Sequence, residues 1–487
     1  TANGVGADII TTGTISSGAG NLTLQAGSGA NANVAINNAV TSTGTLNIRS
    51  SSDPTSNVTV ANAITASGGT TNVSTPTLIL GTSSRVQATT GVLDVSSNVA
   101  GNALTVTLGS GSVLASTTNN LSFNGAGSGA ISINSGLGTL QAGGATPLVL
   151  LNGGAGVGAV DISVNNVIGT AGGTGSTVSV LAQTGDLAVG SITSSGTTLL
   201  QTNGVAADVI ARGAINSGAG NLTLQAGSGA NANVTVNSTV NTSGSLNVVA
   251  GNLVGSNVTV ATAASLSGGT TTITTPSLVV NGTGSVSSNL TNADLQISSN
   301  LASRALTVAL AAPTSTIQST TGNVNFNSVA LPGAITLTGG AANGIVSANG
   351  GAGSINLNGG TNAVAVNANQ LKGVVTGTGS TFTVSSGLVG SVLNTGLIAA
   401  TGNIALSSAG NVLIASDITT SGGNLGVTSG TSAANQISLL ANADLLASNN
   451  VTLTSPNLLL TGGSNTVTAT AGDVALQSNT AGNALAV

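Results

Sequence analysis

Apolar and polar residues alternate in short runs along the chain, and this alternation predicts β-strands. The clearest runs are LTL at residues 22–24, VAI at 34–36, LNI at 46–48 and VTV at 58–60. Stretches rich in Gly, Ser, Asn and Thr separate them. No helical period extends over a useful length, and 72 glycines among 487 residues would weaken any helix. We therefore expect an all-β chain.

The predicted strands recur at a nearly constant interval. Leu22 and Leu46 are 24 residues apart, as are Val34 and Val58. A third, shorter strand position is predicted at Ile15, Val40 and Ile64. Three strands per unit, stacked unit on unit, predict a parallel β-helix with about 24 residues per coil. The rule for parallel crossovers favours right-handed winding.

This arrangement predicts which side chains point inward. Equivalent positions should stack from coil to coil, so we expect an inward column through Leu22, Leu46 and the segment near Val73, and another through Val34 and Val58. Leu24 and Ile48 should also point inward, and Thr23 and Asn47 outward. Glycines are expected to supply positive φ at the corners, as at Gly18, Gly20 and Gly44. Prolines should lie just before strands, as at Pro76, Pro276 and Pro456.

A longer repeat contains the short one. SGAGNLTLQAGSGANANV at residues 17–34 recurs letter for letter at 217–234, and SPNL at 455–458 matches TPTL at 75–78. The long repeats are about 1–200, 201–380 and a partial 381–487. We expect residues 1–487 to form one continuous solenoid, a fragment of a longer chain. Each end should then meet another coil, in the same polypeptide or in a neighbouring subunit placed end to end.

Composition narrows the possible core and partners. Hydrophobic residues make up 40% of the chain, but Phe occurs three times and His, Cys, Met, Trp and Tyr not at all, so the core must be narrow and built from small side chains. The net charge of −5 disfavours nucleic acid and an anionic membrane surface. Without Cys there is no disulfide or zinc–thiolate site. No apolar run is long enough to span a membrane as a helix.

The motifs GAGNLTL, NVTV and SGSLNV, with IxSGxGNLTL opening a coil, resemble the β-helical shaft repeats of filamentous haemagglutinin-type adhesins. The resemblance is one of pattern, and it covers nearly all of the chain. It implies an extracellular, surface-attached fibre of a Gram-negative bacterium, exported by two-partner secretion. Autotransporter passengers and surface-layer or sheath proteins share much of the same pattern.

Catalysis needs groups that exchange protons or attack a substrate. Polysaccharide lyases and hydrolases with a β-helix fold gather several carboxylates, but the ten Asp residues here are dispersed in the sequence. We interpret them as turn or strand-edge residues, at Asp8, Asp53, Asp94, Asp161, Asp186, Asp208, Asp294, Asp417, Asp444 and Asp473. The cations are interpreted as isolated solubilising residues or single partners of an Asp, at Arg49, Arg85, Arg212, Arg304 and Lys372.

Four further patterns in the sequence bear on possible binding sites. Residues 153–156, GGAG, resemble a calcium-binding nonapeptide, but Asp161 lies outside its sixth position, so we predict no metal. Glycosylation sequons are interpreted as turn-capping and ladder-forming Asn, at Asn21, Asn57, Asn221, Asn233 and Asn257. An ice-binding column of outward Thr is interrupted, at Ala35, Asn47 and Asp94. Phe123 and Phe326 occupy equivalent places and are predicted to plug the core.

The sequence therefore favours a non-catalytic extracellular fibre on a bacterial surface, acting in attachment, cell–cell contact or filament and matrix formation. We predict no catalytic residue, cofactor or metal site. Surface glycans or proteins are the expected partners besides further coils. The alternatives are a carbohydrate-active β-helix enzyme and an ice-binding solenoid.

Overall fold

A computed structural model describes residues 1–98, 101–124, 129–154, 157–301, 304–328, 332–339 and 343–480. The chain is a parallel β-solenoid with about 24 residues per turn, as the strand spacing predicted. It divides into two compact units, Thr1–Val234 with Val240–Gly244, and Thr235–Thr239 with Ser245–Val487. The units are described separately.

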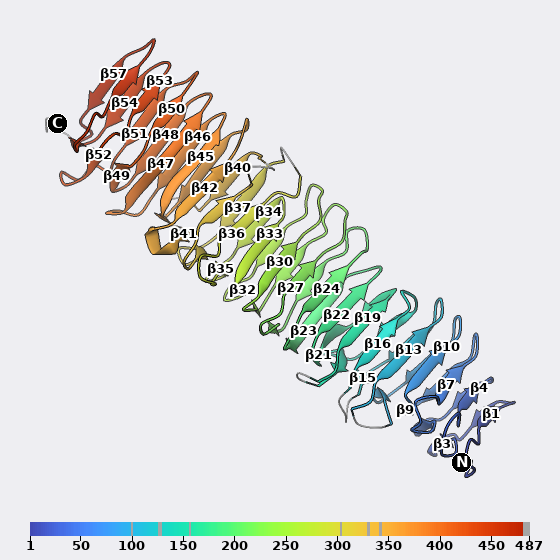
Figure 1. Cartoon of the computed structure of the whole chain (residues 1–487). Coiled ribbons are helices and arrows are strands. Elements are labelled where there is room, and N and C mark those ends of the chain that lie inside the picture. The colour runs from blue at the N-terminus through green and yellow to red at the C-terminus, as the bar shows by residue number, and fades with distance from the viewer. Residues whose placement is uncertain are drawn as a thin grey trace. The chain divides into compact units, whose positions relative to one another are not determined.

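In the first unit, each turn from Ile9 to Gly175 contributes one strand to each of three parallel sheets (Figure 1). The first sheet begins with β1 (Ile9–Thr11), β4 (Val34–Ile36), β7 (Asn57–Val60), β10 (Thr77–Leu80) and β13 (Leu104–Leu108). The second begins with β2 (Ile15–Ser16), β5 (Val40–Thr41), β8 (Thr65–Gly68) and β11 (Arg85–Ala88). The third begins with β3 (Leu22–Gln25), β6 (Thr45–Arg49), β9 (Thr70–Ser74), β12 (Leu93–Ser96) and β15 (Leu121–Phe123).

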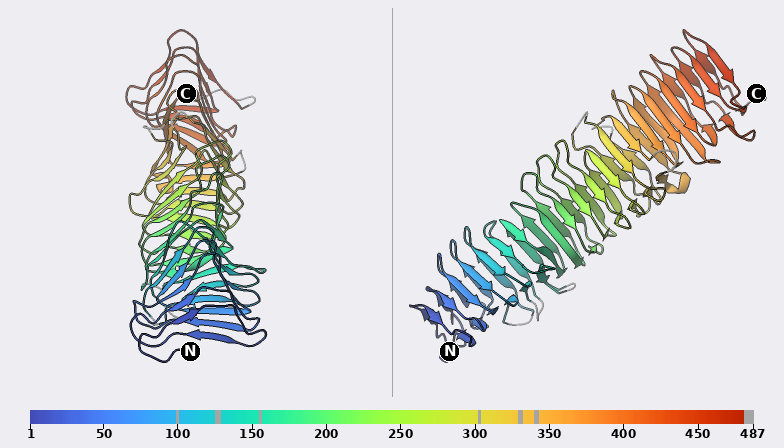
Figure 2. Two further views of the ribbon diagram at one scale, coloured as in Figure 1. Left: turned by 90° about the vertical axis from the view of Figure 1, so that its right-hand side faces the viewer. Right: turned by 180° about the vertical axis from the view of Figure 1, so that it is seen from behind.

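The second unit repeats this arrangement, and its strands, light green to red in Figure 2, lie side by side in chain order. One sheet includes β30 (Ser245–Val249), β33 (Thr270–Thr274), β36 (Leu295–Ser298) and β39 (Val324–Phe326). Another includes β31 (Val258–Val260), β34 (Ser277–Val280) and β37 (Leu306–Leu310). A 3₁₀ turn at Asn349–Gly351 is the single helical element among the described residues.

The predicted stacking of inward residues is confirmed. Leu22 pairs with Leu46, and Val34 pairs with Val58, all in parallel register. One core column of the first unit runs through Leu24, Ile48, Val73, Val95, Phe123 and Leu151. Phe123 and Phe326 are fully buried, as the core-plug interpretation predicted. Leu22 itself is only half-buried, because β3 pairs on one side alone, whereas its equivalent Leu222 is fully buried.

Two local predictions are wrong. Ile64 is not a strand residue: Val40 pairs with Ala66 in β8, because the corner after β7 extends through Ala63, which has φ 57°. Gly18 has the predicted positive φ of 55°, but Gly20 and Gly44 do not. Gly44 is needed for another reason, since a Cβ there would lie 2.9 Å from the carbonyl oxygens of Ala19 and Gly20 one turn earlier.

A long strand occurs once in each unit and follows a bulged partner. β23 (Leu187–Ser194) pairs with β21 (Thr170–Gly175), and β47 (Val392–Ala400) pairs with β45 (Val374–Gly379). In both pairs the register shifts just before a glycine, Gly173 or Gly377. A Cβ on Gly173 would overlap the carbonyl oxygen of Leu151, so this close approach admits only glycine. The corners of a turn can therefore shift in position while its strands stay paired with those of the adjacent turn.

Replacement of the fully buried Leu222 by Ala should cost about 2–5 kcal/mol, because the tight column cannot collapse around the cavity. The neighbouring outward substitution Thr223→Ala is the matched control and should change stability by at most about 0.5 kcal/mol. Hydrogen exchange should show lost protection near the altered turn, since each turn contacts only its neighbours. Loss of protection spread evenly over the first unit would contradict this expectation.

Candidate functional site

An Asn or Asp directly before a strand, or at the first residue of one, bonds to the next turn. The Oδ1 atom of Asp8 accepts the backbone N–H of Asn33 at 2.8 Å, and Oδ1 of Asn33 accepts the N–H of Asn57 at 2.9 Å. The same bond forms from Asn21, Asp186, Asp208, Asp294, Asn403, Asn411, Asp417, Asn424, Asp444 and Asn450. These side chains satisfy corner N–H groups that no strand pairs. Capping was predicted for the sequon residue Asn21, but not for the Asp residues, and the partner one turn later was not predicted for either.

Most acidic residues accept a backbone N–H group from the next turn in this way. Asp473 also precedes a strand, β57 (Val474–Gln477). Asp53 forms a turn, as predicted, in which the hydroxyl and backbone N–H of Thr55 donate to its Oδ1 and hold the pKa of the carboxyl below its ordinary value. The strand-edge interpretation is wrong for Asp94 and Asp161, which lie inside β12 and β19 (Val160–Val164).

Two pairs of carboxylates stack on successive turns. The backbone N–H of Asp208 donates to Oδ1 of Asp186 at 2.9 Å, and that of Asp444 donates to Oδ1 of Asp417 at 3.0 Å. Burial raises the pKa of the Asp208 carboxyl, and the Asp186 carboxylate raises it further, against the opposing hydrogen bonds from Asn233. Within the described ranges, no three acidic side chains come together in a group that could hold a metal ion.

Outward polar residues form ladders in places. The Nδ2 atom of Asn72 donates to Oδ1 of Asn47 at 2.9 Å, and that of Asn356 donates to Oδ1 of Asn325 at 2.6 Å. Asn ladders therefore form, but these two bonds join asparagines other than the sequon residues for which ladders were predicted. Thr59 instead lies between Ala35 and Ile79 on the adjacent turns, so no flat threonine column passes through it. Of the candidate calcium loop, residues 155–156 lie outside the described part, and Asp161 is exposed.

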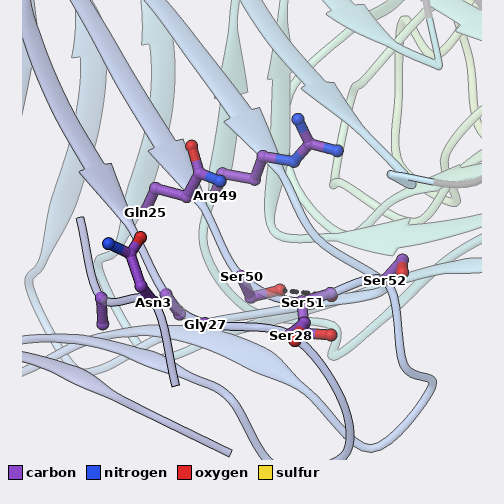
Figure 3. A pocket seen from close by; sticks show the side chains of 10 residues that line it. Asn3, Gln25, Gly27, Ser28, Arg49, Ser50, Ser51 and Ser52 are labelled. Carbon is purple, nitrogen blue, oxygen red and sulfur yellow. Dashed lines mark hydrogen bonds between the residues drawn. The ribbon is translucent and has the colours of Figure 1, made fainter. Parts of the chain in front are cut away.

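Three of the four arginines line surface grooves, which sequence reasoning missed. Figure 3 shows a polar groove of about 300 Å³ in the first unit, lined by Asn3, Gln25 and Arg49 and by a wall of Ser50–Ser51–Ser52. The Arg49 side chain lies beside Gln25 on the neighbouring strand. Arg212 lines a second groove of about 490 Å³ with Pro147 and Thr170. Arg304 lines a third, of about 390 Å³, in the second unit.

Arg85 lies on β11 rather than in any of these grooves, and its Nε donates to Oε1 of Gln87 at 2.5 Å. Lys372 is exposed on β44 (Gln370–Lys372). Arg212 and Arg304 contact uncharged oxygens: Arg212 Nη1 donates to Oγ1 of Thr170 at 3.4 Å, and Arg304 Nη1 donates to the carbonyl of Asn252 at 2.7 Å. The grooves follow from corner geometry, which residue spacing alone did not reveal.

A short corner between two longer ones recurs along the chain. Only Thr75 and Pro76 connect β9 to β10, whereas longer connections, residues 50–56 and residues 97–103, of which 99–100 are not described, lie on the turns before and after. Asn98 spans the short corner, because its Nδ2 donates to the carbonyls of Ser50 and Ser51 at 2.9 and 2.8 Å, two turns back.

The same bridge from an Asn side chain to carbonyls two turns back, here called the clamp, recurs twice in the second unit. Nδ2 of Asn300 donates to the carbonyls of Ala250 and Gly251 at 3.2 and 2.8 Å, across Pro276. Nδ2 of Asn479 donates to the carbonyl of Ser429 at 2.8 Å, across Pro456. The signal available in the sequence was a Ser-Asn pair 21 to 24 residues after each proline. All three prolines directly precede a strand, as predicted.

Comparison with known proteins finds no protein-family model, curated protein or solved structure that matches this chain. No helix within the described residues is long and apolar enough to cross a membrane. The fold and the side chains themselves must therefore support any functional conclusion.

The raised pKa of Asp208 predicts a pH-dependent effect of Asp208→Asn. The folded state disfavours the charged carboxyl, so wild-type stability falls as the pH rises from the ordinary value of 3.8 through the raised pKa. Asn keeps the acceptor for the Asn233 N–H without the charge. We expect a higher melting temperature than wild type at pH 7, and no difference below the ordinary pKa.

Asp53→Asn is the matched control with the opposite sign, because the pKa of Asp53 is lowered. This variant should be less stable than wild type at neutral pH, and the difference should vanish in acid. Melting curves across the pH range measure both effects. An Asp208→Asn variant that is destabilised at pH 7 would contradict the role assigned to burial.

Proposed function

We propose that this chain is a non-catalytic structural shaft on a bacterial surface, of the adhesin or filament kind. The observation that carries the proposal is the regular stacking within each unit, where every turn pairs in parallel with its neighbours around a column of small apolar residues. Such a coil propagates by adding equivalent turns, which suits a molecule that has to extend. The resemblance to haemagglutinin-type shaft repeats supports an extracellular place for it.

The distribution of charge supports a non-catalytic role. Most carboxylates already accept a backbone N–H group from the next turn, so one oxygen of each of them holds a corner in place. The described residues that line the three arginine grooves include no carboxylate. A glycoside-cleaving site needs two such groups around one bond. Asp186 and Asp208 lie on successive turns and interact, so this pair is the best place to test an enzymatic alternative.

The location of the protein on the cell tests the proposal directly. Antibodies against residues 1–487 should label intact cells that make the protein, and external protease should remove the label. A deletion strain should attach or aggregate less, and the wild-type gene should restore this more fully than Leu222→Asp, which buries a charge in the core. Thr223→Asp, on the outward side of the same strand, is the matched control. Labelling that requires cell lysis would refute the extracellular shaft.

Turnover tests the enzymatic alternative. The purified chain should release no reducing ends or unsaturated products from neutral or acidic polysaccharides. Any turnover that Asp186→Asn or Asp208→Asn abolishes, while Asp53→Asn leaves it intact, would replace the structural proposal with a catalytic one.

A further inference from the structure

The groove beside Arg304 forms where a short corner lies between two longer ones. Only Thr275 and Pro276 connect β33 to β34, while residues 250–257 precede β31 and residues 299–305, of which 302–303 are not described, precede β37. Asn300 ties the two longer connections together across Pro276. The groove of about 390 Å³ lies within the second unit and has a volume typical of small-ligand sites.

Arg304 is held in place on one wall of this groove. Its Nη1 donates to the carbonyl oxygen of Asn252 at 2.7 Å, and the residue is half-buried. This bond uses one of the five N–H donors of the guanidinium. No carboxylate is among the described residues that line the groove, so the charge of Arg304 is not neutralised there. A pre-positioned guanidinium matches a carboxylate through two parallel hydrogen bonds.

The other walls provide apolar and hydroxyl groups. Val254 is 78% exposed and Pro276 is half-buried, and both line the groove. Ser277 and Thr307, which pair on adjacent strands, add hydroxyl groups. Apolar patches beside hydroxyl and guanidinium groups suit a ring with C–H faces, several hydroxyls and one negative charge.

The equivalent corner of the first unit differs at two of these features. Pro76 is buried where Pro276 is half-buried, and Asn102 replaces Arg304. The clamp is present in both, through Asn98 and Asn300. The clamp therefore belongs to the fold, whereas the open proline and the arginine are particular to the groove in the second unit.

We propose that this groove binds a uronic acid unit of an acidic polysaccharide, with Arg304 holding the sugar carboxylate. The inference rests on the proposed shaft function and names the chemistry of one partner. Binding takes place at a local positive site on a chain of net charge −5, so it depends on the fit of one carboxylate rather than on overall attraction.

The test measures binding of trigalacturonate to the purified chain of residues 1–487 by calorimetry. Its methyl ester has the same rings without the charges and should bind at least about tenfold more weakly, as expected for loss of a charge-assisted hydrogen bond. Arg304→Gln should lose a similar factor, and Arg304→Lys should be intermediate because it keeps the charge but not the fork. Arg85→Gln is the matched control and should bind as wild type does.

A second variant keeps the test independent of the Arg304–Asn252 contact. Val254 is strongly exposed, so Val254→Asp should leave the melting temperature unchanged and weaken binding at least about tenfold through charge repulsion. Equal affinity for the acid and the ester, equal loss in Arg85→Gln and Arg304→Gln, or no binding of trigalacturonate would each overturn the inference. If binding fails while antibodies still label intact cells, the groove assignment falls and the shaft proposal stands.

Discussion

Parallel pairing in register from one turn to the next is the constraint on which the rest of this structure depends. It places each residue against its equivalent about 24 residues later. The side chains at equivalent positions therefore stack in a column and have to fit against one another. The column through Leu24, Ile48 and Val73 shows the result, a narrow core in which side chains of similar size stack. Aromatic rings fit only at selected levels, such as Phe123 between Val95 and Leu151.

The same pairing creates a problem at the corners, where backbone N–H groups leave the sheets. Asn and Asp side chains resolve it by accepting an N–H from the following turn, as in the series from Asp8 through Asn33 to Asn57. An unpaired N–H at these corners would cost free energy comparable to a lost hydrogen bond. Most Asp carboxylates of this chain accept such a backbone hydrogen bond. The number of carboxylates in the sequence therefore says little about catalytic activity.

Corners are also where the molecule can vary without disturbing its sheets. β9 and β10 are joined by two residues while the turns on either side use longer connections, and Asn98 bridges the difference. A groove lined by Arg304 lies at one such corner, and Arg49 and Arg212 line two further grooves in a chain with five cations. The sheets thus provide the shaft, and the corners provide surfaces on which recognition can differ from turn to turn.

The sequence by itself determined the class of fold, because alternation and a constant spacing report directly on strands that stack. It also identified Phe123 and Phe326 as core residues and the prolines as residues before strands. It misplaced the third strand at Ile64, since the length of a corner depends on local backbone angles such as the positive φ of Ala63 and not on period. Only the tertiary structure brought Asn300 to residues about 50 positions earlier and Arg304 to the groove above Pro276, because those contacts arise between turns.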